Sequence, residues 1–312
     1  MSQPLYQRLG HGVYQLDAHY VNPGVACLYC VVHDEQVAII ETGTAHSLPY
    51  VKQFLADLSL SADQVRYVVP THVHLDHAGG AGVMMRDFPR AELVIHPRGA
   101  RHMIDPEKLV AATRVVYGDK VFDRLYGEIP AIEKERVISA EHLYSFKLGE
   151  REFIIIDTPG HAYHHFCVVD PASNGIFTGD TFGLSYPNLQ FKGNRFIIPT
   201  STPSHFDPAA LHQSIDMMMS YQPDRMYMTH FGILPDPASL VEHYHAMIDR
   251  YVEVTLKVKP ENQPAIDSLV KALGELLASE FDLADDVVNQ QMKMDIKLNA
   301  QGLAHWYQHR ER

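Results

Sequence analysis

The sequence predicts a layered α/β fold followed by a helical segment at the C-terminal end. Short runs rich in β-branched and aromatic residues alternate with helical segments between residues 13 and 228. Beyond Pro235, three stretches have apolar residues at helical spacing and no strand-like run. We therefore expect helix-covered sheets over residues 1–235 and a C-terminal helical appendage over residues 236–312.

The N-terminal part of the chain predicts antiparallel strands, because its apolar runs are short and are separated by turn residues such as Asn22-Pro23-Gly24. The expected strands cover residues 12–16, 27–32, 37–40, 65–69, 93–96, 143–146, 153–156, 175–178 and 225–228. Helical spacing appears over residues 47–58 and, less regularly, over 99–135. The helices expected in the appendage cover residues 237–254, 264–280 and 285–307.

The three cysteines predict buried thiols and no disulfide framework, because their number is odd. Cys27 and Cys30 have the spacing of a redox or zinc motif, but they lie in a strand-like run. Residues at positions i and i+3 of a strand face opposite sides, so we expect core thiols here and not a redox or zinc pair.

Composition excludes several classes of partner. The formal net charge of −12 argues against nucleic acid, which is bound through a basic surface. An apolar run of 18 residues is absent, and the N-terminal residues lack the charged and apolar regions of a signal peptide. We expect a cytoplasmic protein that acts on a small molecule, without a nucleic-acid or membrane partner.

The segment His72-Val73-His74-Leu75-Asp76-His77 predicts a metal site. It follows a predicted buried strand that Pro70 ends, and its side chains are ligand types that zinc, iron and manganese prefer. In extended chain His72 and His74 point the same way and can reach one ion. Asp76 and His77 lie where the chain turns into a helix and would face a second ion.

Three more polar residues follow predicted strands. His161, Asp180 and His230 each come after an apolar run and have a glycine within two residues. Loops above a rigid sheet are where functional side chains are expected.

In their order and rough spacing, these segments resemble the metallo-β-lactamase-fold hydrolases, and among them the glyoxalase-II-like branch. The resemblance rests on residues 72–80, Thr158-Pro159-Gly160-His161, Gly179-Asp180-Thr181 and Thr229-His230-Phe231-Gly232, and it covers about residues 12–232. It implies a four-layer αββα sandwich.

The resemblance also implies a set of ligands. His72, His74 and His161 would bind one metal ion, Asp76, His77 and His230 would bind the other, and Asp180 would bridge the two. His165 matches a position often occupied by a further histidine, which would contact a ligand. Glu41 stands where many relatives carry an aspartate, so we expect its carboxylate to hold a ligand histidine, with a shifted geometry.

This reading predicts a two-metal hydrolase in which a metal-bridging hydroxide attacks an ester, thioester, lactone or related substrate. Asp76 would orient the nucleophile as well as bind metal. The expected cofactors are two divalent ions, zinc first, with iron or manganese as alternatives. Two other functions stay open: a mononuclear iron dioxygenase acting on a persulfide, and a non-catalytic, metal-containing binding module on the same fold.

Substrate selection is expected in the segment 184–205 and in the C-terminal helices. Tyr186 and Phe191 are candidate apolar contacts, and Lys192 and Arg195 are candidate partners for a substrate carboxylate. Leu269, Leu273, Leu276, Leu277 and Phe281 form an apolar stripe that packing within the domain or a homodimer would cover.

Overall fold

The computed structural model describes residues 5–191, 194–201, 204–284 and 286–310. It divides into two compact units. Unit 1 comprises Met1–Asp157, His164–Gly179 and Asp224–Leu234, and unit 2 comprises Thr158–Tyr163, Asp180–Pro223 and Pro235–Arg312. The division of the chain at residues 235 and 236 stays a prediction.

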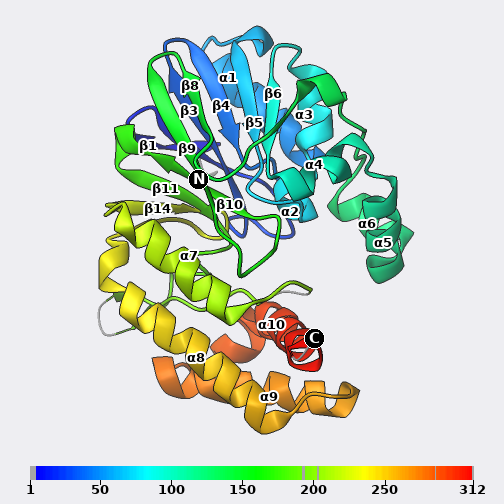
Figure 1. Cartoon of the computed structure of the whole chain (residues 1–312), viewed down its shortest axis with the longest axis vertical. Coiled ribbons are helices and arrows are strands. Elements are labelled where there is room, and N and C mark those ends of the chain that lie inside the picture. The colour runs from blue at the N-terminus through cyan, green and yellow to red at the C-terminus, as the bar shows by residue number, and fades with distance from the viewer. Residues whose placement is uncertain (1–4, 192–193, 202–203, 285, 311–312) are drawn as a thin grey trace. The chain divides into compact units, whose positions relative to one another are not determined.

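The first sheet of unit 1 has seven strands in chain order (Figure 1). They are β1 (Tyr6–Gly10), β2 (Val13–Asp17), β3 (Cys27–His33), β4 (Gln36–Ile40), β5 (Val65–Val69), β6 (Glu92–Ile95) and β7 (Val137–Ser139). Strands β1 to β4 are antiparallel, and β4 to β7 run parallel to one another. The parallel arrangement brings the carboxyl ends of β4 and β5 to the same edge of the sheet.

The second sheet has the order β15-β14-β11-β10-β9-β8. Its strands are β8 (Ser145–Leu148), β9 (Arg151–Asp157), β10 (Phe166–Asp170), β11 (Gly175–Gly179), β14 (Arg225–Met228) and β15 (Gly232–Pro235). Strands β8 to β11 are antiparallel, and β11 pairs in parallel with β14.

The two sheets pack face to face in unit 1. The core between them contains Tyr29, Ile40 and Val69 from the first sheet and Phe166 and Phe177 from the second. A second core lies between the first sheet and helices α1 (Leu48–Asp57), α3 (Ala81–Asp87) and α4 (Pro97–Ile104). Strand alternation separates the two cores, because each buried strand sends neighbouring side chains to opposite faces.

Three more helices belong to unit 1. Helix α2 (Leu75–Ala78) follows β5 after a short loop, and α5 (Glu107–Tyr117) and α6 (Asp119–Leu125) come after α4. Phe122 and Tyr126 pack with Leu75 of α2 in a small apolar cluster. The predicted mixed α/β fold with helix-covered sheets is confirmed.

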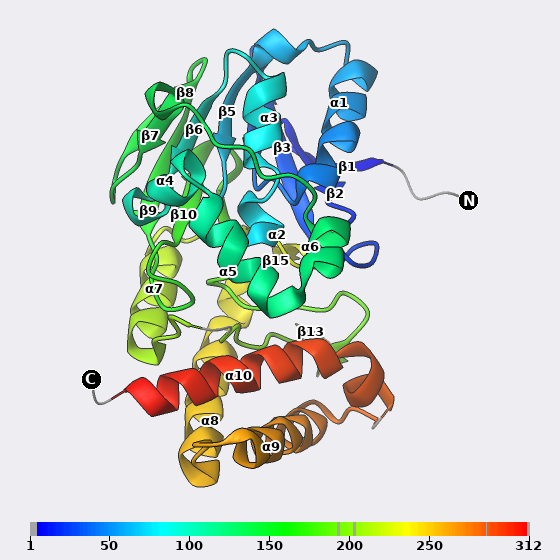
Figure 2. The same ribbon diagram turned by 90° about the vertical axis from the view of Figure 1, so that its right-hand side faces the viewer.

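Unit 2 is mainly helical. It contains α7 (Pro208–Ser220), α8 (Val241–Val258), α9 (Gln263–Phe281) and α10 (Lys293–His309), with the short hairpin β12 (Gln190–Phe191) and β13 (Asn194–Arg195). Figure 2 shows α8, α9 and α10 side by side. The predicted C-terminal helices are present, whereas α7 was not predicted.

The predicted apolar stripe of α9 is largely covered within unit 2. Leu269, Leu273, Leu277 and Phe281 are buried, and Leu276 is partly exposed. Helix α9 packs against α8 and α10, which supply the covering surface.

Short helical turns lie at Ala45–Ser47, Ala62–Gln64, Lys134–Arg136, Pro171–Ser173, Pro237–Ser239 and Val287–Gln291. Among the described residues, none of the helices combines the length and the apolar character needed to cross a membrane.

Candidate metal centre

The candidate site of unit 1 begins at the carboxyl ends of β4 and β5. Glu41 follows β4, and its backbone N–H donates to the Val69 carbonyl at the end of β5 at 3.0 Å. The segment His72–His77 comes directly after this point. Parallel strands therefore bring Glu41 and the predicted ligands to one edge of the sheet.

Asp76, His77 and His230 form a compact group at this edge. Their ligand atoms all lie within 4.8 Å of one another. Asp76 Oδ2 is 3.8 Å from His77 Nε2 and 3.6 Å from His230 Nε2. Two imidazoles and a carboxylate at this spacing are a donor set suited to a divalent metal ion.

The two histidines of this group are each fixed through their other ring nitrogen. His77 Nδ1 lies 3.0 Å from Glu41 Oε1, and His230 Nδ1 lies 3.1 Å from the Val25 carbonyl. Carboxylate and carbonyl oxygens only accept, so in both neutral rings Nδ1 carries the proton and Nε2 keeps its lone pair toward Asp76. Outer hydrogen bonds of this kind orient metal-binding imidazoles.

Glu41 connects several parts of the site through one buried carboxylate. Its Oε1 accepts from the hydroxyls of Thr71 at 2.6 Å and Thr229 at 2.7 Å as well as from His77, and Oε2 accepts from the Thr71 backbone N–H at 3.1 Å. Because the Thr71 hydroxyl donates to Glu41, its oxygen is free to accept from His72 Nδ1, 3.1 Å away. The carboxylate thus reaches two predicted ligands, His77 directly and His72 through Thr71.

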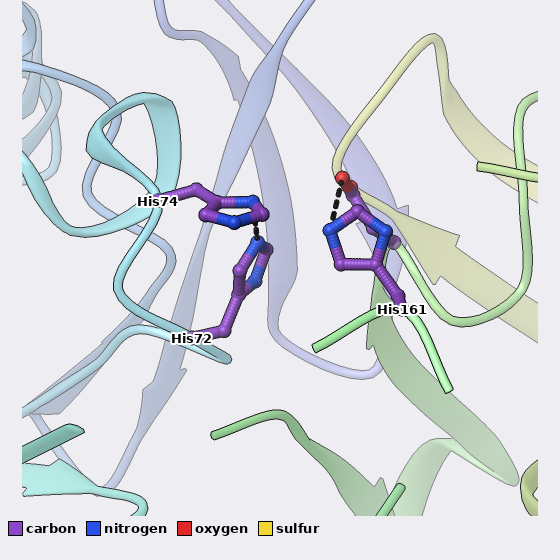
Figure 3. Close-up of side chains that lie close together, drawn as sticks. His72, His74 and His161 are labelled. Atoms are coloured by element: carbon purple, nitrogen blue, oxygen red, sulfur yellow. Dashed lines mark hydrogen bonds and ion pairs between the residues drawn. The ribbon is translucent and has the colours of Figure 1, made fainter. Parts of the chain in front are cut away.

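His72 and His74 lie against each other in unit 1. Figure 3 shows the contact between His72 Nε2 and His74 Nδ1, which are 2.8 Å apart. His165 is buried beside them, and its ring centroid is 4.9 Å from that of His72. His165 therefore touches a predicted ligand.

In unit 2, His161 and Asp180 form a second pair. His161 Nε2 is 3.4 Å from Asp180 Oδ2, and both side chains are buried. His161 Nδ1 donates to the Thr200 carbonyl at 3.2 Å, and the Thr200 hydroxyl donates to the Asp180 carbonyl at 2.7 Å. Thr200 thus holds both predicted ligands of this unit.

Helix α10 holds the segment that contains Thr200. The Asn299 amide oxygen accepts from the Ser201 backbone N–H at 2.6 Å, and its nitrogen donates to the Pro199 carbonyl at 3.0 Å. Asn299 thus forms hydrogen bonds with the backbone on both sides of Thr200. In unit 2 the C-terminal helix therefore supports His161 and Asp180.

Comparison with known proteins identifies the family of the chain. The model of the metallo-beta-lactamase superfamily matches residues 22–230, which is more than half of the chain. The chain belongs to the metallo-beta-lactamase superfamily.

Relatives from three organisms are similar to the chain. The metallo-beta-lactamase fold-containing protein ST1585 of Sulfurisphaera tokodaii is 26% identical over 73% of this chain and 80% of its own length. The acyl-coenzyme A thioesterase MBLAC2 of Homo sapiens is 25% identical over 56% of this chain and 65% of its length. The probable hydroxyacylglutathione hydrolase glo2 of Schizosaccharomyces pombe is 26% identical over 50% and 48%.

The fold of the superfamily extends over nearly all of the chain. The crystal structure of ST1585 from Sulfolobus tokodaii aligns with a TM-score of 0.63 and 23% identity, covering 94% of this chain and 98% of that one. The alignment includes the C-terminal helical region. The predicted fold class is confirmed.

The candidate substrate residues of this superfamily member differ in their surroundings. Tyr186 is buried, and its hydroxyl donates to Asp295 of α10. Arg195 donates to the Ser185 carbonyl. Phe191 belongs to β12, and Lys192 lies outside the described residues. Tyr186 and Arg195 therefore make internal hydrogen bonds, and their role in substrate binding stays a prediction.

Two tyrosines of unit 1 were not predicted to be near the site. The hydroxyls of Tyr20 and Tyr126 are 3.2 Å apart. Burial raises the pKa of both phenols, and the nearby charge of Asp76 adds to the increase. Because Tyr20 lies in an irregular loop and Tyr126 at the end of α6, no periodic pattern in the sequence links either residue to Asp76.

Proposed function

We propose that this protein is a hydrolase that uses two divalent metal ions to cleave a small-molecule thioester. The observation that carries the proposal is the group formed by Asp76, His77 and His230, because each imidazole is anchored through Nδ1 and keeps Nε2 directed at the carboxylate. A two-metal hydrolase needs a second complete ligand group, whereas a mononuclear enzyme does not need one.

In this proposal the two pairs described above supply the other metal position. His72 and His74 from unit 1 would act with His161 from unit 2, and Asp180 would contact both ions. Three imidazoles and a carboxylate suit zinc, with iron and manganese as the alternatives.

The bound ions would supply a hydroxide nucleophile near neutral pH and would polarise the substrate carbonyl. The chain's own part is to place and hold the reacting groups. Asp76 would accept a hydrogen bond from the attacking oxygen and so orient it. Glu41 fixes the ring orientation of His77, and the Val25 carbonyl fixes that of His230.

Thioesters are favoured among the predicted substrates because of the relatives. An acyl-coenzyme A and a hydroxyacylglutathione are both thioesters, and the names of MBLAC2 and glo2 describe activity on these two compounds. The net charge of −12 supports a small molecule over nucleic acid. A cytoplasmic location and a homodimer are further parts of the proposal.

Metal counting together with thiol release tests the function. The purified protein should contain two divalent ions per chain and release thiol from a thioester without oxygen. Asp76→Asn should keep the side-chain shape, bind less metal and lose activity by about 10²-fold or more, since both a ligand charge and an orienting group are lost. His33→Ala, at a partly exposed histidine on β3, is the matched control and should keep both metal and activity.

Other results would favour the alternative functions. One iron per chain, oxygen consumption with a persulfide and full activity of His230→Ala would replace the hydrolase with the dioxygenase. Two bound ions without hydrolysis of thioesters, esters or lactones would favour the binding module.

A further inference from the structure

Helices α7 and α8 of unit 2 carry a histidine–aspartate quartet that the proposed function does not use. His212 and Asp216 are four residues apart on α7, and His245 and Asp249 are four residues apart on α8. Residues at this spacing share one face of a helix. Each helix therefore presents one imidazole and one carboxylate to the other.

The ion pairs of the quartet cross between the helices. His212 Nε2 is 3.1 Å from Asp249 Oδ1, and His245 Nε2 is 3.2 Å from Asp216 Oδ1. A carboxylate can only accept, so both imidazoles carry a proton on Nε2. On each ring, Nδ1 is then the nitrogen that does not contact a carboxylate.

The two Nδ1 atoms are directed at each other across a distance of 2.5 Å. The ring planes differ by only 13°, and the ring centroids are 4.8 Å apart. With both protons on Nε2, each neutral ring would place a lone pair on Nδ1. Two lone pairs this close repel each other, so a cation must stand between them: either one shared proton or a metal ion.

We propose that His212 and His245 bind a divalent transition-metal ion through their Nδ1 atoms, with water completing the coordination. Imidazole nitrogen is a preferred ligand of zinc, nickel and copper ions. The hydrogen bonds from Nε2 to carboxylates are the arrangement that fixes metal-binding imidazoles. The site shares no residue with the proposed hydrolase centre.

The formal charges of the quartet match a divalent ion. Asp216 and Asp249 contribute two negative charges, which a divalent ion neutralises and a single proton does not. Tetrahedral zinc, with bonds of about 2.0–2.1 Å, would place the two nitrogens about 3.3 Å apart. The rings therefore need to separate by about 1 Å and to tilt until both lone pairs converge on the ion. The histidine side chains are 28% and 25% exposed, which gives coordinating water access.

Nickel titration of the purified protein, with its native metals retained, tests the site. Isothermal calorimetry and metal analysis after dialysis should show one additional Ni²⁺ per chain. This binding should disappear in His212→Ala and His245→Ala. Asp216→Ala should weaken it by about 10–100-fold, because the carboxylate orients His245.

His309→Ala is the matched control. His305 and His309 form another histidine pair, four residues apart on α10, with ring centroids 4.2 Å apart. This variant should bind the additional Ni²⁺ as the parent protein does. Circular dichroism checks that each variant is folded, and His245→Gln replaces His245→Ala if the alanine variant does not fold.

The proposal is overturned if the parent protein binds no additional Ni²⁺, or if His212→Ala binds it with unchanged affinity. Loss of the additional ion in His309→Ala alone would assign the binding to α10 and would also overturn it.

Discussion

Glu41 has a backbone φ of 63°, in the left-handed region, and one buried carboxylate that serves three side chains and a backbone N–H. From the sequence we expected this carboxylate to hold a ligand histidine. Its partners Thr71 and Thr229 were not predicted, because hydrogen bonds between residues far apart leave no spacing signal. The residue-scale prediction therefore included the candidate ligands and Glu41 but omitted the threonines that contact Glu41.

Replacing Glu41 with glutamine should weaken metal binding and stability together. One of the two carboxylate oxygens becomes an amide nitrogen, which would face groups that now donate to it. We expect about 10–100-fold weaker metal binding and a decrease of about 1–3 kcal/mol in the free energy of unfolding. Metal competition and urea unfolding measure the two effects.

Glu35→Gln provides the control for this variant. Glu35 also has a positive φ, 57°, but it is exposed in the turn between β3 and β4. Its replacement should change neither quantity. Equal metal affinity in Glu41→Gln and the parent protein would contradict the role assigned to the carboxylate.

At the scale of elements, strands and helices with strong periodic patterns were predicted well. Strand β5 spans Val65–Val69 as predicted, and α9 contains the residues of the expected apolar stripe. Helix α7 was missed although its start has clear signals: Asp207 accepts from the Ala210 backbone N–H as an N-cap, and Pro208 occupies the first turn. Its consecutive methionines blur the helical period, which explains the omission.

Asn299 allows a prediction about how helix α10 supports the site. Asn299→Ala removes the contacts that hold the chain on both sides of Thr200, so His161 and Asp180 lose part of their support. We expect metal affinity to fall by about 10-fold or more, with the variant still folded. Gln301→Ala, exposed on the same helix, should leave metal affinity unchanged. If both variants bind metal as the parent protein does, α10 does not support the ligands.

At the scale of the whole molecule, several ionisable groups are buried in their neutral form. Burial raises the pKa of the Cys27 thiol to about 12, and it also raises the pKa values of Cys30 and Tyr251. In the unfolded chain a thiol loses its proton near pH 8.5 and a phenol near pH 10. The unfolded state therefore releases protons first as the pH rises, and the folded protein loses stability from about pH 9 upward.

Urea unfolding at pH 7.5 and pH 10.5 measures this effect. The free energy of unfolding should fall by about 3 kcal/mol for each buried thiol that titrates only in the unfolded chain. Cys27→Ala should reduce the fall by the contribution of one thiol. A free energy of unfolding that is the same at both pH values would contradict the prediction.

The fold class followed from local patterns, but the two compact units did not. Unit 2 joins residues 158–163 and 180–223 with a segment that begins at Pro235. Such grouping depends on contacts between distant parts of the chain, and hydrophobic periodicity describes only neighbours in sequence. His161 and Asp180 were predicted as ligands because they follow apolar strands, whereas their membership of unit 2 required the structure.

Strand β3 places two thiols three residues apart in different surroundings. Cys27 lies in the core between the two sheets, and Cys30 lies in the core between the first sheet and its helices. A thiol reagent can reach each one only when its own layer opens. The labelling rate of Cys27 would therefore report how often the core between the sheets opens, and that of Cys30 how often the core under the helices opens. Comparing the two rates measures which layer of unit 1 unfolds locally more often.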